Sequence, residues 1–212
     1  MQGVVPCRLE YALVRKSAFD VARQPIVDRL GRSVAYELLF RHDGGGHAEV
    51  RDSAGASSQV ISRTFRQIGA DTALGRSAAF INFDEEGLWS PTLARLPRER
   101  VVLELLETLE VSDRIVHRCA DLKARGFRLA LDDLTEIPEG DDRLLALADV
   151  IKVDVLALDP ATLEALVARL RDYPAKLLAE KVDSPQRASH CLDLGFDLLQ
   201  GYWLGAPERL RG

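Results

Sequence analysis

The stretch Leu129-Ala130-Leu131-Asp132-Asp133 holds three apolar residues of strand character followed by two adjacent carboxylates. A short apolar run bounded by turn residues is typical of a buried strand. Two neighbouring aspartates at its end are unfavourable without a counter-charge, because charges about 4 Å apart repel by roughly 4 kcal/mol at an effective dielectric constant of 20. An isolated pair of this kind is usually solvated in a loop. Its meaning therefore depends on whether the same arrangement recurs along the chain.

Strands and helices alternate on both sides of this stretch. Short apolar runs bounded by turn residues predict eight strands, at 19–27, 34–40, 78–83, 101–106, 128–132, 150–155, 176–180 and 197–200. Helical spacing, N-cap residues and glycine stops predict helices at 56–68, 88–96, 112–126, 143–147, 159–171 and 184–194. Strands that alternate with helices are typical of a parallel sheet.

Eight strands separated mostly by helices favour an α/β fold, a modified (β/α)8 TIM-like barrel. The short turn at 28–32 predicts an antiparallel hairpin, so that one strand runs against the others. An open doubly wound sheet is the alternative, although no Gly-x-Gly-x-x-Gly follows the first strand. Because no linker rich in proline, glycine or serine interrupts the pattern, we expect an N-terminal extension at 1–17 and one barrel domain at 18–212.

Composition narrows the class of protein further. The net charge of −5 disfavours nonspecific binding to a DNA or RNA polymer, which requires a basic surface. Cys7, Cys119 and Cys191 lie far apart without metal-ligand spacing, which favours buried thiols in a reduced, cytoplasmic protein. No apolar run approaches the roughly 18 residues of a membrane span, and the N-terminus lacks the apolar core of a signal peptide. We therefore expect no membrane partner.

Polar side chains recur at the ends of the predicted strands. They are Glu37, Asn82, Glu104 with Glu107, Asp132 with Asp133, Lys152 with Asp154, Glu180 and Gln200. The active sites of barrel enzymes lie at this edge of the sheet. Carboxylate and amide oxygens suit Mg²⁺ or Mn²⁺, and so many acidic ligands suit the two metal ions that clamp a phosphoryl group during transfer. Arg41, four residues after Glu37, is placed for a bidentate phosphate contact.

Together these motifs resemble the signature of the EAL domain family, which hydrolyses the bacterial second messenger cyclic di-GMP. The matching segments are Gln24-Pro25-Ile26-Val27, Tyr36-Glu37-Leu38-Leu39-Phe40-Arg41, Ile81-Asn82-Phe83, Leu103-Glu104-Leu105-Leu106-Glu107, Asp132-Asp133, Ile151-Lys152-Val153-Asp154, Ala179-Glu180 and Gln200-Gly201-Tyr202. The resemblance extends over about 19–207 and implies a modified eight-stranded β/α barrel with one antiparallel strand.

The resemblance also implies a two-metal site of Mg²⁺ or Mn²⁺ in which Asp132 is shared. The implied ligands are Glu37, Asn82, Glu104, Asp132 and Asp133. The implied catalytic residues are Lys152, Glu180, Gln200 and Glu107. Lys152 and Glu180 would position and activate the attacking water, and Glu107 would steady the segment after the two aspartates. Arg41 and Asp154 would contact the substrate, and the reaction would open cyclic di-GMP to linear pGpG.

Two departures from the family pattern bear on activity. Active members continue Asp-Asp with Phe-Gly-Thr-Gly, whereas this chain continues with Leu134-Thr135-Glu136-Ile137-Pro138, which lacks the flexible glycines and adds a proline. The usual Ala-Glu-Gly-Val-Glu has become Ala179-Glu180-Lys181-Val182-Asp183. These sequence variants resemble the EAL half of EAL–HDOD signalling proteins, which are often weak or inactive hydrolases.

The functional hypotheses therefore stay open. The first is a metal-dependent cyclic di-GMP phosphodiesterase. The second is a catalytically weak or inactive EAL module that acts as a cyclic di-GMP receptor or as a protein-interaction domain. The third is an unrelated metal-dependent phosphoesterase on the same barrel. The resemblance further suggests a C-terminal HDOD domain missing from this chain and a homodimer.

Overall fold

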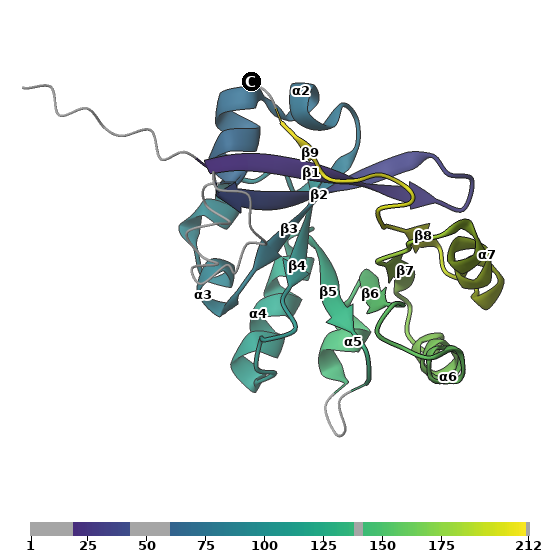
Figure 1. Cartoon of the computed structure of the whole chain (residues 1–212). Coiled ribbons are helices and arrows are strands. Elements are labelled where there is room, and N and C mark those ends of the chain that lie inside the picture. Colours follow the sequence, from purple (N-terminus) through teal and green to yellow (C-terminus); the bar gives the residue numbers. More distant parts are fainter. Residues whose placement is uncertain (1–18, 43–59, 138–141, 211–212) are drawn as a thin grey trace, which may run out of the picture.

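The computed structural model describes residues 19–42, 60–137 and 142–210. Within these ranges the strands form a closed ring with helices around its outside (Figure 1). The N-terminal extension predicted at 1–17 lies outside the described residues, as do the first residues of the helix predicted at 56–68.

The ring consists of one hairpin and a series of parallel strands. Its members are β1 (Phe19–Asp28), β2 (Ser33–His42), β3 (Ala78–Phe83), β4 (Val101–Leu105), β5 (Arg128–Leu134), β6 (Val150–Asp154), β7 (Lys176–Glu180) and β8 (Leu198–Leu199). Strands β2 to β8 pair in parallel in chain order. Strand β1 pairs antiparallel with both β2 and β8 and so closes the ring. This confirms the modified barrel with one antiparallel strand, and the doubly wound alternative is wrong.

The hairpin turn between β1 and β2 is fixed by local hydrogen bonds. Asp28 Oδ1 accepts hydrogen bonds from the backbone amides of Leu30 (2.9 Å) and Arg32 (3.0 Å). Gly31 adopts a φ of 73°, a left-handed conformation that glycine reaches without a Cβ penalty. A further short strand, β9 (Glu208–Arg209), was not predicted and pairs antiparallel with β1. Two residues are too few to show a periodic pattern.

Helices pack on the outer side of the ring (Figure 1). In the described residues they are η1 (Ser62–Ile68, a π-helix), α2 (Ala70–Leu74), α3 (Glu85–Leu88), the 3₁₀ helices η2 (Pro91–Arg95) and η3 (Arg98–Arg100), α4 (Asp113–Ala124), α5 (Arg143–Leu147), α6 (Pro160–Leu170) and α7 (Pro185–Leu194). The predicted N-caps Ser112, Asp159 and Ser184 each accept a hydrogen bond from a backbone amide of the first turn. The helix predicted at 88–96 is wrong, because α3 ends at Leu88 and Pro91 begins a separate 3₁₀ turn.

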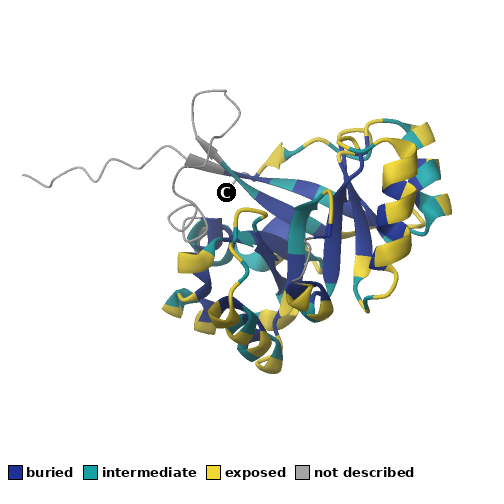
Figure 2. Cartoon of the chain, turned by 90° about the horizontal axis from the view of Figure 1, so that it is seen from below, coloured by how far each residue is buried: buried dark blue, intermediate teal, exposed yellow. Residues whose placement is uncertain are grey.

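Burial follows this arrangement. The strands are largely buried, and the exposed residues lie on the outward faces of the helices and on loops (Figure 2). Cys119 and Cys191 are buried free thiols, as predicted, whereas Cys7 lies outside the described residues. Over 19–42, 60–137 and 142–210, no helix combines the length and apolar composition of a transmembrane segment.

Candidate active site at the carboxyl end of the barrel

An apolar layer and a polar layer lie one above the other inside the barrel. Every strand of the ring contributes one residue to the apolar layer, which consists of Ile26, Ala35, Phe80, Val102, Ala130, Val150, Leu178 and Leu198. Because alternate residues of a strand face the same side, the next inward position lies two residues further on. These positions form the polar layer, which consists of Gln24, Glu37, Asn82, Glu104, Asp132, Lys152, Glu180 and Gln200.

The polar layer lies at the carboxyl ends of the parallel strands, as the sequence predicts. On β1, which runs in the opposite direction, the same step leads backward from Ile26 to Gln24. Seven of the eight members were predicted from the strand ends, and Gln24 was missed as a site residue. The antiparallel direction of β1 could have identified it, because the inward position then precedes the apolar residue instead of following it.

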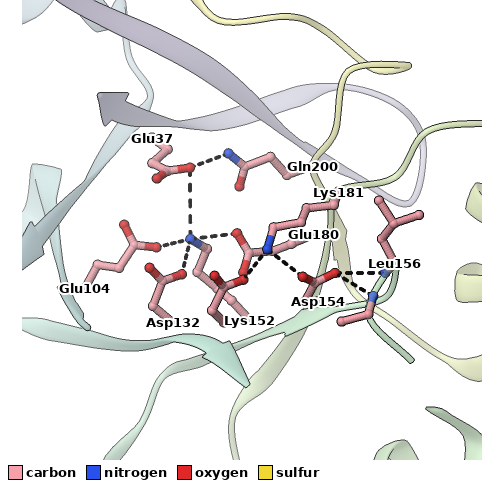
Figure 3. Close-up of polar contacts among 11 residues, drawn as sticks. Glu37, Glu104, Asp132, Lys152, Asp154, Leu156, Glu180, Lys181 and Gln200 are labelled. Atoms are coloured by element: carbon pink, nitrogen blue, oxygen red, sulfur yellow. Dashed lines mark hydrogen bonds and ion pairs between the residues drawn. The ribbon is translucent and has the colours of Figure 1, made fainter. Parts of the chain in front are cut away.

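Lys152 lies at the centre of the polar layer (Figure 3). Its Nζ is 2.7 Å from Asp132 Oδ1, 2.9 Å from Glu180 Oε1 and 4.0 Å from Glu37 Oε2, and it also forms an ion pair with Glu104. The Lys152 side chain is only 1% exposed. Burial alone would lower the pKa of Lys152, but the surrounding carboxylates outweigh burial and raise this pKa well above its usual range. The ammonium is therefore a fixed positive charge.

Four carboxylates lie around Lys152, and among the described side chains the Lys152 ammonium is the one positive charge that they contact. Burial raises the pKa of Glu104 well above its usual range, against the opposing charge of Lys152. Burial also raises the pKa of Glu180 to about 7, again opposed by Lys152. Apart from the ion pair with Lys152, the Glu104 carboxylate has no hydrogen-bond partner among the described residues, and Glu180 Oε2 has none. Buried carboxylates in this state are neutralised either by a proton or by a further cation.

The donor set of the polar layer therefore fits a hard divalent cation. Oxygen ligands from several carboxylates and one amide are those that Mg²⁺, Mn²⁺ and Ca²⁺ prefer. Among the described residues, no three acidic, histidine or cysteine side chains are already gathered as a metal-ligand set. The carboxylates instead converge on the Lys152 ammonium, so a cation would have to draw them toward itself.

Gln200, which follows β8, links members of the polar layer on β1 and β2, where the barrel closes. Its Nε2 donates hydrogen bonds to Glu37 Oε2 at 2.5 Å and to Gln24 Oε1 at 3.3 Å. Gln24 Nε2 in turn donates to the carbonyl oxygen of Gly205 at 3.1 Å. These bonds hold the Glu37 carboxylate in one orientation, and they join the hairpin β1–β2 to the segment that follows β8.

A second charged cluster lies beside the polar layer. Lys181 Nζ is 2.5 Å from Asp154 Oδ2 (Figure 3). It is also 2.8 Å from Asp133 Oδ1. Burial would raise the pKa of Asp154, but hydrogen bonds from Lys181 and from the amides of Leu156 and Ala157 lower it overall. The sequence predicts Asp133 and Asp154 as site residues, whereas Lys181 was noted only as a departure from the family pattern.

Glu107 lies outside the polar layer, and Arg41 is described only in its backbone. Glu107 is exposed after β4 and lines a separate hollow of about 230 Å³ together with Leu134, Thr135 and Glu136. This position faces the segment that Glu107 was predicted to steady. Arg41 belongs to β2, where its Cα pairs with Asp20, and its side chain lies outside the described part of the structure.

A pocket of about 500 Å³ opens above the polar layer. Its lining includes the polar residues Gln24, Glu37, Asp132, Lys152, Glu180 and Gln200 and the charged residues Asp133, Lys181 and Asp183. Leu39, Leu156, Gly201 and Tyr202 complete the wall. A volume of this size accommodates a small molecule, and the few polar groups at its floor would determine which one binds.

Comparison with known proteins places this architecture in a family. The sequence model of the EAL domain matches residues 7–207. This chain belongs to the EAL domain family. Within the family it is similar to the cyclic di-GMP phosphodiesterase CdgJ of Vibrio cholerae, with 35% identity over 196 residues that cover 90% of this chain and 45% of CdgJ. The EAL domain chain spans about half the length of the curated relatives it matches.

Solved EAL domain structures have the same fold. The Bacillus subtilis YkuI protein, in complex with cyclic di-GMP and calcium, superimposes with a TM-score of 0.70 at 23% identity. The superposition covers 92% of this chain and 56% of YkuI. The PaMucR phosphodiesterase in its cyclic di-GMP complex gives a TM-score of 0.73 at 21% identity, covering 91% of this chain and 97% of that structure. At these identities the similarity confirms the fold of the barrel.

Proposed function

We propose that this EAL domain binds cyclic di-GMP in the 500 Å³ pocket and hydrolyses one phosphodiester bond to give linear pGpG. The observation that carries the proposal is the polar layer, in which seven of the residues expected for this chemistry at the strand ends lie at one level of the barrel. The similarity to CdgJ, which is named a cyclic di-GMP phosphodiesterase, supports the same substrate. A cytoplasmic location, in keeping with the buried free thiols, is part of the proposal.

The proposed cation is Mg²⁺ or Mn²⁺. Its ligands would be Glu37, Asn82, Glu104 and Asp132, which occupy neighbouring strands of the polar layer. When bound, such a cation polarises a phosphate oxygen and lowers the pKa of a coordinated water molecule. Asp133 was predicted to take part in holding a second cation. In the structure its carboxylate is already paired with the Lys181 ammonium, which would compete with that cation.

The other site residues have proposed roles that follow from their contacts. Lys152 holds Glu180 through Oε1, which leaves Glu180 Oε2 to accept a proton from the attacking water. Gln200 fixes the orientation of Glu37 through its hydrogen bond. Arg41 and Asp154 stay the proposed substrate contacts, and Glu107 the proposed support of the segment after Asp133.

Turnover is tested by incubating the protein with cyclic di-GMP and Mn²⁺ and measuring pGpG by chromatography. We expect pGpG from the unaltered chain and at least a hundredfold less from Asp132→Asn, because that change removes a carboxylate shared by the proposed cation and Lys152. Asp172→Asn is the matched control, since Asp172 is exposed beyond α6 and should leave turnover unchanged. Absence of pGpG at high protein concentration would contradict hydrolysis.

A cyclic di-GMP receptor without turnover is the second candidate. The ion pair between Lys181 and Asp133 favours it, because it engages a carboxylate that the two-metal prediction requires. Calorimetry distinguishes the candidates: binding of cyclic di-GMP without pGpG supports the receptor, and no binding leaves a protein-interaction domain. The C-terminal HDOD domain and the homodimer suggested by the resemblance stay predictions, and light scattering of the chain in solution checks the dimer.

A further inference from the structure

Lys181 places an ammonium group over the pocket beside the polar layer. It directly follows β7, and its Nζ contacts Asp154 at the end of β6 (Figure 3). The same Nζ contacts Asp133 at the end of β5. One cation thus joins carboxylates from two neighbouring strands. The Lys181 and Asp133 side chains are 46% and 37% exposed, so this cluster is open to ions from the solvent.

The backbone around the cluster is arranged for this contact. Lys181 has a φ of 58° and Asp133 a φ of 50°, and they are the only non-glycine residues with positive φ among those described. The two residues with this uncommon backbone conformation form an ion pair with each other. Asp154 Oδ1 accepts the amides of Leu156 at 2.9 Å and Ala157 at 3.0 Å, which turns its Oδ2 toward Lys181.

We propose that the Lys181 ammonium takes the place of a second divalent cation at Asp133, so that this EAL domain binds one divalent cation per chain, within the polar layer. The inference rests on the proposed function, because it assumes that the polar layer holds a cation. A divalent cation bound to Asp133 Oδ1 at about 2.1 Å would lie within roughly 5 Å of the ammonium that contacts the same atom. At that separation the two positive charges repel. Four carboxylates surround Lys152 and offset such a repulsion in the polar layer. Lys181 instead contacts Asp133 and Asp154, which its own charge already engages, so the ammonium and a second cation exclude each other there.

The test counts Mn²⁺ bound at equilibrium, by dialysis and elemental analysis, together with electron paramagnetic resonance. We expect one Mn²⁺ per chain and a mononuclear signal from the unaltered protein. Lys181→Met and Lys181→Gly should each bind two, with the exchange-coupled signal of a manganese pair. The glycine variant also relieves the left-handed backbone, so it guards against a folding defect in the methionine variant.

Two controls keep the charge effect specific. Lys176→Met removes the same charge from the opposite end of β7, where Lys176 is exposed, and should still bind one Mn²⁺. Lys181→Arg retains a cation and should also bind one. Two Mn²⁺ in the unaltered protein, or one in both Lys181→Met and Lys181→Gly, would overturn the proposal.

The outcomes also separate this inference from the proposed function. One Mn²⁺ per chain without any binding of cyclic di-GMP would contradict the proposed function and leave the role of Lys181 intact. Two Mn²⁺ per chain with production of pGpG would contradict the role of Lys181 and support the proposed function. No uptake of Mn²⁺ would overturn both.

Discussion

At the scale of single residues, Lys152 holds the polar layer together. Four carboxylates surround its ammonium, and those of Glu37, Glu104 and Glu180 are buried with it. A buried charge that loses its partner is far more costly than a surface charge, because it keeps its desolvation penalty without the compensating attraction. The lysine therefore stabilises the fold of the protein when no cation is bound.

Replacing Lys152 with methionine should destabilise the protein by about 3 kcal/mol in the presence of a chelator, since it leaves buried carboxylates uncompensated. Urea denaturation measures this free energy of unfolding. Lys123→Met is the matched control, because Lys123 pairs with Asp149 at 2.8 Å on a partly exposed surface, where an ion pair contributes about 0–1 kcal/mol. Equal effects of the two changes would contradict a central role for Lys152.

The sequence predicts most members of the polar layer because strand residues alternate with a period of two. Once the strands are assigned, the polar position two residues beyond an apolar inward residue identifies Glu104, Lys152 and Glu180 directly. Lys181 does not follow this rule. It lies one residue past an inward position and reaches the pocket because its backbone turns left-handed, a conformation that periodicity cannot reveal.

At the scale of elements, the predicted caps determine where the long helices begin. Ser112, Asp159 and Ser184 act as N-caps, and prolines follow two of them at the first helical position. Elements too short for a periodic pattern, such as β9 and the 3₁₀ turns, were not found. A helix cap depends on neighbouring residues and can therefore be predicted from the sequence. A two-residue strand depends on pairing with a strand that is distant in the sequence.

Ser184→Ala should lower the free energy of unfolding by about 1 kcal/mol, because the Ser184 hydroxyl accepts a hydrogen bond from the amide of Arg187 at 3.3 Å. Chemical denaturation followed by circular dichroism measures the change. Ser189→Ala in the same helix is the control, since Ser189 is exposed within α7 and alanine favours a helix interior. A loss of stability in both variants would count against the cap.

At the scale of the whole molecule, the barrel has a narrow seam. Strands β1 and β8 pair through only two residues of each strand, whereas β1 and β2 pair along most of their length. Arg29, in the turn of the hairpin, reinforces this seam by donating to the carbonyl oxygens of Phe196 at 2.6 Å and Leu192 at 3.1 Å. The strand order could be predicted from the sequence, but this tie between distant segments could not.

Arg29→Met should therefore increase amide hydrogen exchange in β8 while leaving β4 and β5 protected, because the seam loses its hydrogen bonds to the end of α7. Exchange measured by mass spectrometry on peptic fragments reports the two regions separately. Arg32→Met is the control, since Arg32 forms its ion pair with Asp28 inside the turn itself. Unchanged exchange in β8 would contradict the role assigned to Arg29.

The hydrogen bonds of Gln200 have a consequence for biosynthesis. Gln200 joins Gln24 and Glu37, which a ribosome synthesises more than 160 residues earlier. Translation proceeds from the amino end, so the early hairpin waits for the late segment before the floor of the pocket is complete. A ligand that recognises this floor would bind finished chains and ignore nascent ones. Binding of such a ligand therefore requires that the barrel has closed.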